Sequence, residues 1–156
     1  MAEQLMQAAR TGDIETVRRL IAAGTDVNAR DERGWTAIAY AVYDAEAKRG
    51  YAEVVQALID AGADLEAAIG YGVRPLMLAA GYGEAEVVAT LLNAGADVLA
   101  KNEGGFTALM MAKQKFYVDV INMLHEAERD AGIGENSCAS KNAPGSNVVT
   151  FLKRPQ

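Results

Sequence analysis

The sequence predicts an all-α solenoid, in which short pairs of antiparallel helices stack side by side. Two repeating markers support this prediction. The first is a Gly-x-Asp triplet at 24–26, 62–64 and 95–97, with spacings of 38 and 33 residues. The second is a glycine ahead of each later helix pair, Gly34, Gly72 and Gly105, which repeats the same two spacings. A fixed period of about 33 residues is typical of stacked units built from a turn and two helices, and one unit here carries five extra residues.

Unit one, residues 1–30, contains two apolar stripes with helical spacing. The first helix is predicted from Leu5, Ala8 and Ala9, which share one face, and it ends at Gly12. The second helix carries Ile14, Val17, Leu20 and Ile21. Because very few residues join the two helices, they are expected to lie antiparallel and to bury their apolar faces against the next unit.

Unit two, residues 31–68, opens with a turn from Asp31 to Gly34, and Thr36 is placed to cap the helix that follows. Its second helix carries the apolar stripe Val54, Val55, Leu58 and Ile59. The five extra residues fall between Tyr43 and Tyr51, in a stretch rich in helix formers. We therefore expect them to lengthen the first helix by more than a turn.

Units three and four, residues 69–101 and 102–131, repeat the pattern with informative departures. Pro75 suits the first turn of a helix. Ile69 replaces the opening Asp, which predicts a different turn in unit three, and Phe116 replaces the Gly that separates the two helices of unit four. The stripes of the second helices are Val87, Val88, Leu91 and Leu92 in unit three, and Val118, Val120, Ile121 and Leu124 in unit four. The three methionines of the first helices, Met77, Met110 and Met111, are interpreted as core residues.

Composition excludes several classes of function. The 156 residues suit one domain, and a net charge of −6 disfavours binding to nucleic acid or to anionic membranes. No apolar run of about 18 residues and no signal peptide is visible, so the default expectation is a cytoplasmic protein. Cys138 and His125 are the only residues of their kinds, which disfavours a disulfide framework or a multi-histidine metal site. We expect no catalytic residue, metal or cofactor.

The repeated residues resemble the ankyrin repeat family. Asp31, Gly34 and Thr36 match its opening pattern, Glu86-Val87-Val88 match its middle, and Gly95 to Val98 match its close. The match extends over residues 4–128. The resemblance implies an ankyrin-repeat solenoid with β-hairpin-like turns over residues 1–131, followed by a tail at 132–156.

The resemblance also implies a partner protein bound on a concave surface of hairpin tips and first helices. Large rings dominate binding hot spots, and five aromatic residues fall at such positions: Trp35, Tyr43, Tyr71, Tyr82 and Phe106. Local packing is the alternative explanation for them. Carried over position by position, the predicted binding residues are Arg10, Arg33, Trp35, Tyr43, Asp44, Tyr71, Tyr82, Phe106 and Lys115. The implied function is a non-enzymatic adaptor or inhibitor that is monomeric.

The tail leaves three alternatives open. Residues 132–147 are rich in Gly, Ser, Asn and Ala, and they precede an apolar and basic run at 148–154. The run can be a disordered terminus, a cover for the exposed side of unit four, or a motif bound by another molecule. A self-assembly element, in which the tail docks on its own or a neighbour's repeats, is therefore the alternative function. An enzyme that uses Cys138 or His125 is a weaker rival.

Overall fold

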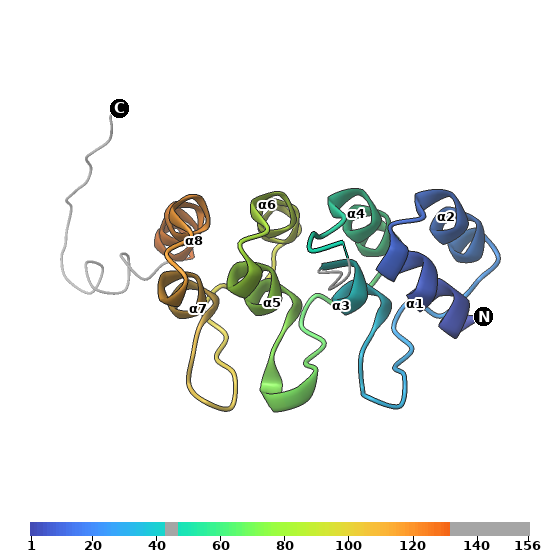
Figure 1. Ribbon diagram of the computed structural model, residues 1–156, viewed down its shortest axis with the longest axis horizontal. Helices are drawn as coiled ribbons and strands as arrows, with labels where there is room; N and C mark the ends of the chain where they lie inside the picture. The colour runs from blue at the N-terminus through green and yellow to red at the C-terminus, as the bar shows by residue number, and fades with distance from the viewer. Residues whose placement is uncertain (43–46, 132–156) are drawn as a thin grey trace, which may run out of the picture.

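The computed structural model describes residues 1–42 and 47–131, and these residues form helix pairs arranged in two rows (Figure 1). The inner row is α1 (Ala2–Thr11), α3 (Ala37–Val42), α5 (Pro75–Tyr82) and α7 (Ala108–Gln114). The outer row is α2 (Ile14–Ala22), α4 (Ala52–Asp60), α6 (Ala85–Asn93) and α8 (Val118–Asp130). Neighbouring helices within each row are in contact, so the described units stack in chain order. Tyr43, Asp44 and the tail lie outside the described residues.

The core is built from the same repeat positions in every unit. One such position holds alanine throughout, and its side chain is at most 5% exposed: Ala8, Ala41, Ala79 and Ala112. Small side chains at this position allow the inner helices to approach closely. A second position holds a larger aliphatic residue that is at most 7% exposed: Leu5, Ile38, Leu76 and Leu109. Small and large side chains at these alternating positions together form the buried core between units.

Three loops project from the inner row on the side away from the outer row (Figure 1). We call residues 30–36, 68–74 and 101–107 the hairpins of units two, three and four. The first tip residue of each hairpin donates its N–H to the carbonyl of the last, over 2.8–3.0 Å: Asp31 to Trp35, Ile69 to Val73, and Asn102 to Phe106. In unit three the tip forms a short 3-10 helix, η1 (Gly70–Gly72), and Tyr71 has a φ of 61°. The prediction that Ile69 alters this tip is confirmed.

Phe116 takes the left-handed conformation that glycine takes in two other units. Its φ is 59°, against 75° for Gly12 and 73° for Gly83. The turn after it closes in the usual way, because the N–H of Tyr117 donates to the carbonyl of Ala112 over 3.2 Å. The substitution therefore leaves the inter-helix turn intact. It places a non-glycine residue in a backbone region that costs about 1–2 kcal/mol.

The predicted lengthening of the first helix of unit two by more than a turn is wrong, because such a helix would continue through Ala47 and Lys48, and residues 43–46 lie outside the described residues. Helix α3 ends at Val42, and Ala47 and Lys48 lie in a turn. The N–H of Tyr51 donates to the carbonyl of Ala41 over 2.9 Å, which is the same bond that closes the other inter-helix turns. Five more helical residues would move the start of α4 by about 7.5 Å along the helix axis, out of its row. Stacking of the outer helices thus outweighs the helix propensity of Ala47 and Lys48.

Met110 and Val118 of unit four were predicted to be core residues, and both predictions are wrong. Met110 is 45% exposed, whereas Met77 at the same repeat position is 2% exposed. Val118 is 63% exposed, although Val120 and Leu124 on the same helix are buried as predicted. Nothing in the described part of the chain stacks on the far side of unit four, so apolar positions that a following unit would cover remain open there.

Candidate functional site

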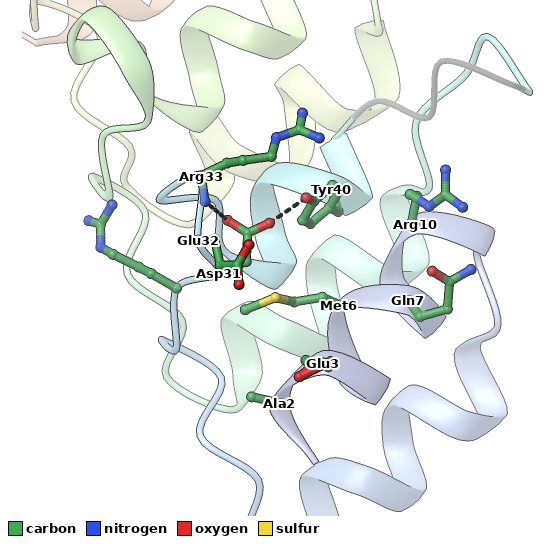
Figure 2. A pocket seen from close by; sticks show the side chains of 10 residues that line it. Ala2, Glu3, Met6, Gln7, Arg10, Asp31, Glu32, Arg33 and Tyr40 are labelled. Atoms are coloured by element: carbon green, nitrogen blue, oxygen red, sulfur yellow. Dashed lines mark hydrogen bonds between the residues drawn. The ribbon is translucent and has the colours of Figure 1, made fainter.

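The hairpin of unit two is organised around one carboxylate. Asp31 Oδ1 accepts hydrogen bonds from the backbone N–H groups of Arg33 at 2.9 Å and Trp35 at 2.8 Å. Its other oxygen, Oδ2, accepts from the hydroxyl of Tyr40 at 2.5 Å. Tyr40 belongs to α3, so the aspartate ties the hairpin tip to the inner helix. Figure 2 shows Asp31 linked in this way to both Arg33 and Tyr40.

These contacts lower the pKa of Asp31 and raise the pKa of Tyr40. Burial by itself would raise the pKa of Asp31, but the hydrogen bonds from Tyr40, Trp35 and Arg33 together outweigh it, so that this pKa lies below its ordinary value. Burial, followed by the hydrogen bond to Asp31, raises the pKa of Tyr40 above its ordinary value. The pair therefore remains an ionised carboxylate facing a neutral phenol across the neutral pH range.

The side chains of the same hairpin form an aromatic and cationic stack. The rings of Trp35 and Tyr40 have centroids 5.0 Å apart and are tilted by 39°. The guanidinium of Arg33 lies 5.4 Å from the centroid of the Trp35 ring. A ring pair of this kind contributes about 0.5–1.5 kcal/mol beyond its buried area, and an exposed cation–π contact about 0.5–1 kcal/mol. The half-buried Trp35 is therefore held in place before any partner arrives.

A pocket of about 700 Å³ lies between α1 and this hairpin (Figure 2). Its charged lining is balanced between three cations, Arg10, Arg30 and Arg33, and three carboxylates, Glu3, Asp31 and Glu32. Arg33 and Arg10 lie close enough to Tyr40 to oppose the rise of its pKa. Met6 and Gln7 of α1 complete the wall opposite the hairpin. The pocket thus presents a mixed-charge surface with an aromatic edge.

Arg30 joins this hairpin to the next one. Its guanidinium donates to the carbonyl of Gly34 at 3.0 Å and to the carbonyl of Ala68 at 2.7 Å. These bonds fix the spacing of the unit-two and unit-three hairpins. Arg30 and Tyr40 both escaped the sequence reasoning. Tyr40 stands where the other units carry Gln7, Leu78 and Met111, and that single difference is the signal that could have identified it.

Units three and four present their aromatic residues to solvent. Tyr71, at the tip of its hairpin, is 82% exposed, and its carbonyl accepts the N–H of Glu103 from the next hairpin at 3.0 Å. Phe106, at the base of that next hairpin, is 40% exposed, and Tyr82, at the end of α5, is 46% exposed. Lys115, which follows α7, is also exposed. These side chains lie on the elements that the family resemblance assigns to the concave surface.

The predicted binding residues therefore divide into two groups. Arg10 and Arg33 line one pocket, and Trp35 stacks against Arg33 beside it. Tyr71, Tyr82, Phe106 and Lys115 lie on units three and four. Within the described residues, the ring contact of Trp35 is with Tyr40 rather than with another predicted aromatic residue. The predicted members Tyr43 and Asp44 lie outside the described residues.

Other kinds of site find no support in the described part of the chain. Across residues 1–42 and 47–131, no three His, Cys, Asp or Glu side chains are grouped so that they could hold a metal ion. No helix over the same ranges has the length and apolarity needed to cross a membrane.

The fold and the hairpins define a class of protein, the helical repeat solenoids. Within that class, a family model for ankyrin repeats (three copies) matches residues 5–102 and 45–136, and the chain belongs to the ankyrin repeat family. The prediction of an all-α ankyrin-repeat solenoid is thereby confirmed.

Curated relatives share the repeats over part of their length. The chain is 38% identical over 79 residues to mouse ankyrin repeat domain-containing protein 40, a match that covers 50% of this chain and 20% of the relative. It is 39% identical over 64 residues to mouse protein phosphatase 1 regulatory subunit 27, covering 41% and 38% of the two chains. It is also 45% identical over 60 residues to bovine mitochondrial disaggregase, covering 38% of this chain and 8% of that protein. The chain thus matches about a fifth to two fifths of the first two relatives.

Proposed function

We propose that this chain is a non-enzymatic adaptor or inhibitor that binds a partner protein on its concave surface of hairpin tips and inner helices. The observation that carries the proposal is the exposure of Tyr71, Tyr82 and Phe106 on those elements. Large rings left open to solvent on a rigid surface suit a binding role, because they bury much area with little loss of rotamer entropy. Ankyrin repeats in general mediate protein–protein interaction, and one relative is by name a phosphatase regulatory subunit.

The two groups of residues have different roles in this proposal. The open rings of units three and four supply the apolar anchors, and the mixed-charge pocket of unit two supplies orientation, since charge complementarity contributes more to specificity than to affinity. The hairpin of unit two is already held by Asp31, Tyr40 and Arg30. A surface held in this way loses little conformational entropy on binding.

The test compares two double variants that remove similar kinds of exposed apolar side chain. Tyr71→Ala/Tyr82→Ala removes rings from the concave elements. Leu99→Ala/Val118→Ala removes exposed side chains from a loop after α6 and from α8. Each purified variant is used to capture partners from an extract of the source cells, and the captured protein is then titrated.

We expect the concave variant to bind at least about 30-fold more weakly, which corresponds to a hot-spot loss of about 2 kcal/mol, while the control binds like the parent chain. Circular dichroism confirms that both variants are folded. Equal affinity of the two double variants for the captured partner would contradict the concave site.

A further inference from the structure

A groove of about 600 Å³ lies between the outer helices α6 and α8, away from the concave elements. Its apolar floor includes Leu92, Val98 and Met123. Its rim carries the carboxylates of Asp97, Glu126 and Asp130, and none of the residues described as lining it is Lys, Arg or His. The chemistry of this groove therefore suits an apolar segment that carries positive charge.

The groove lies where a ladder of contacts between successive loops stops. The side chain of Asn28, after α2, donates to the carbonyl of Gly62 at 3.2 Å and accepts from the N–H of Asp64 at 2.7 Å. Glu66, at the same repeat position after α4, accepts from the N–H of Asp97 at 3.0 Å. The next residue in this series is Leu99, which is 39% exposed. The described loop after α6 thus ends in an apolar side chain where its predecessors carry polar links to the following unit.

Helix α8 forms the second wall of the groove, and it is longer than its counterparts. It contains 13 residues, whereas α2, α4 and α6 contain nine each. Glu126 occupies the repeat position at which α6 ends, at Asn93. The extra turn carries Asp130 past that point, alongside the loop after α6. The additional helical turn therefore adds Asp130 to the wall of the groove, and the nine-residue helices α2, α4 and α6 have no such turn.

We propose that residues 148–154 of the same chain dock in this groove. The segment Val148-Val149-Thr150-Phe151-Leu152-Lys153-Arg154 has apolar residues followed by two cations, which complement the apolar floor and the three carboxylates. The other open apolar area of unit four, around Met110 and Val118, carries Lys113 on the same α7 helix and Lys115 just after it. Those lysines repel Lys153 and Arg154. The end of the stack also carries Asp119, next to Val118, whereas the groove is lined by three carboxylates and no cation, so charge favours the groove.

Residues 148–154 are covalently linked to the groove through residues 132–147, so even a weak contact is sufficient to keep them docked. Ala131 lines the groove, and the 16 residues from 132 to 147 join it to the docking segment. From its composition, rich in Gly, Ser, Asn and Ala, a segment of that length is expected to span about 20–24 Å (root mean square) and to keep residues 148–154 at a local concentration of the order of millimolar. Exposed ion pairs contribute only about 0–1 kcal/mol each, so burial of Phe151 and Leu152 provides most of the affinity.

The experiment uses the full chain with a nitroxide label and amide NMR spectra. Cys138→Ser removes the one native thiol, and Ser146→Cys places the label just ahead of the docking segment. We expect loss of the amide signals of Leu92, Met123 and Ala127 relative to the sample with reduced label. Lys153→Glu/Arg154→Glu should reduce the loss to the level that a tethered but undocked label produces, and adding Glu126→Lys/Asp130→Lys to that variant should increase the loss again.

Three outcomes would overturn the proposal. Equal signal losses around the groove in the parent chain and in Lys153→Glu/Arg154→Glu would show that the segment is free or bound elsewhere. Loss at Met110 and Val118 instead would place it on the end of the stack. Loss at Met123 and Ala127 only when an isotope-labelled Cys138→Ser chain is mixed with an unlabelled, spin-labelled chain would assign the groove to a second copy. Signals outside the affected region serve as the control for folding.

Discussion

The hairpins of units two and four share a backbone but differ in what surrounds their tips. Asp31 and Asn102 occupy the same repeat position, and each accepts two backbone N–H bonds within its own turn. In unit two, Tyr40 and Trp35 then stack over this turn. In unit four the corresponding aromatic residue, Phe106, is 40% exposed. The shared positions specify the turn, and the variable positions decide whether its aromatic residue supports the fold or faces solvent.

This difference gives the two hairpins different uses. A ring held by neighbours contributes to stability and presents a fixed edge, as Trp35 does beside the pocket at α1. An exposed ring contributes little to folding, so its apolar area is available for a partner. A repeat protein can therefore combine a stabilising hairpin and a binding hairpin without changing its backbone.

The largest expected effect comes from removing the turn-forming side chains. Asp31→Ala loses three hydrogen bonds, including one to a partly buried phenol, and should reduce the free energy of unfolding by about 2–3 kcal/mol. Asn102→Ala loses two bonds and should cost about 1–2 kcal/mol. Urea unfolding of both variants measures the difference. Equal losses would mean that Tyr40 adds nothing to the first hairpin.

A smaller effect is expected from the rings. Trp35→Ala removes a half-buried ring with its tyrosine and arginine contacts, and it should destabilise the chain by about 1–2 kcal/mol. Phe106→Ala should cost less than about 1 kcal/mol, because much of that ring is already in water. Thermal unfolding of the two variants, followed by circular dichroism, ranks them. A larger loss for Phe106→Ala would reverse the assignment of supporting and exposed rings.

The smallest expected effect is a pH-dependent loss of stability, which arises in the hairpin of unit two because only there does a tyrosine donate to the turn-forming carboxylate. Tyr40→Phe removes one hydrogen bond to Asp31 and should cost about 1 kcal/mol at pH 7. The pKa of Asp31 is lowered in the folded chain, so this stability is present above the unfolded value of about 3.9 and is lost as the pH falls through the folded pKa. The parent and variant stabilities should therefore converge in acid. Denaturant titrations between pH 7 and pH 2.5 test this, and a gap that stays constant would exclude Asp31 as the titrating partner.

The fold was predictable because its determinants recur. Alanines such as Ala8 and Ala79 and glycines such as Gly12 and Gly83 appear in every unit or nearly so, and each recurrence supports the others. Even Phe116, which breaks the pattern, adopts the backbone that the pattern requires. A pattern that recurs in several units identifies the helices and turns more reliably than the sequence of a single helix does.

Features that depend on one unit alone were harder to predict. The Tyr40–Asp31 bond joins residues nine positions apart that no other unit pairs, so no repetition indicated it. Helix propensity suggested a first helix that continues past Lys48, but propensity is a weak preference, and Ala47 and Lys48 lie in a turn. Met110 has the sequence environment of a core residue, and its 45% exposure follows from its place in the last described unit.

The bond between Tyr51 and Ala41 has a practical consequence for protein engineering. It closes the helix pair in the same way whether the intervening chain is short, as in unit three, or five residues longer, as here. The entropic cost of such a closure rises by only about 0.6 kcal/mol for each doubling of loop length. The interval between α3 and α4 is therefore a suitable place to graft a foreign peptide, such as an epitope or a protease site, without altering the stacked scaffold.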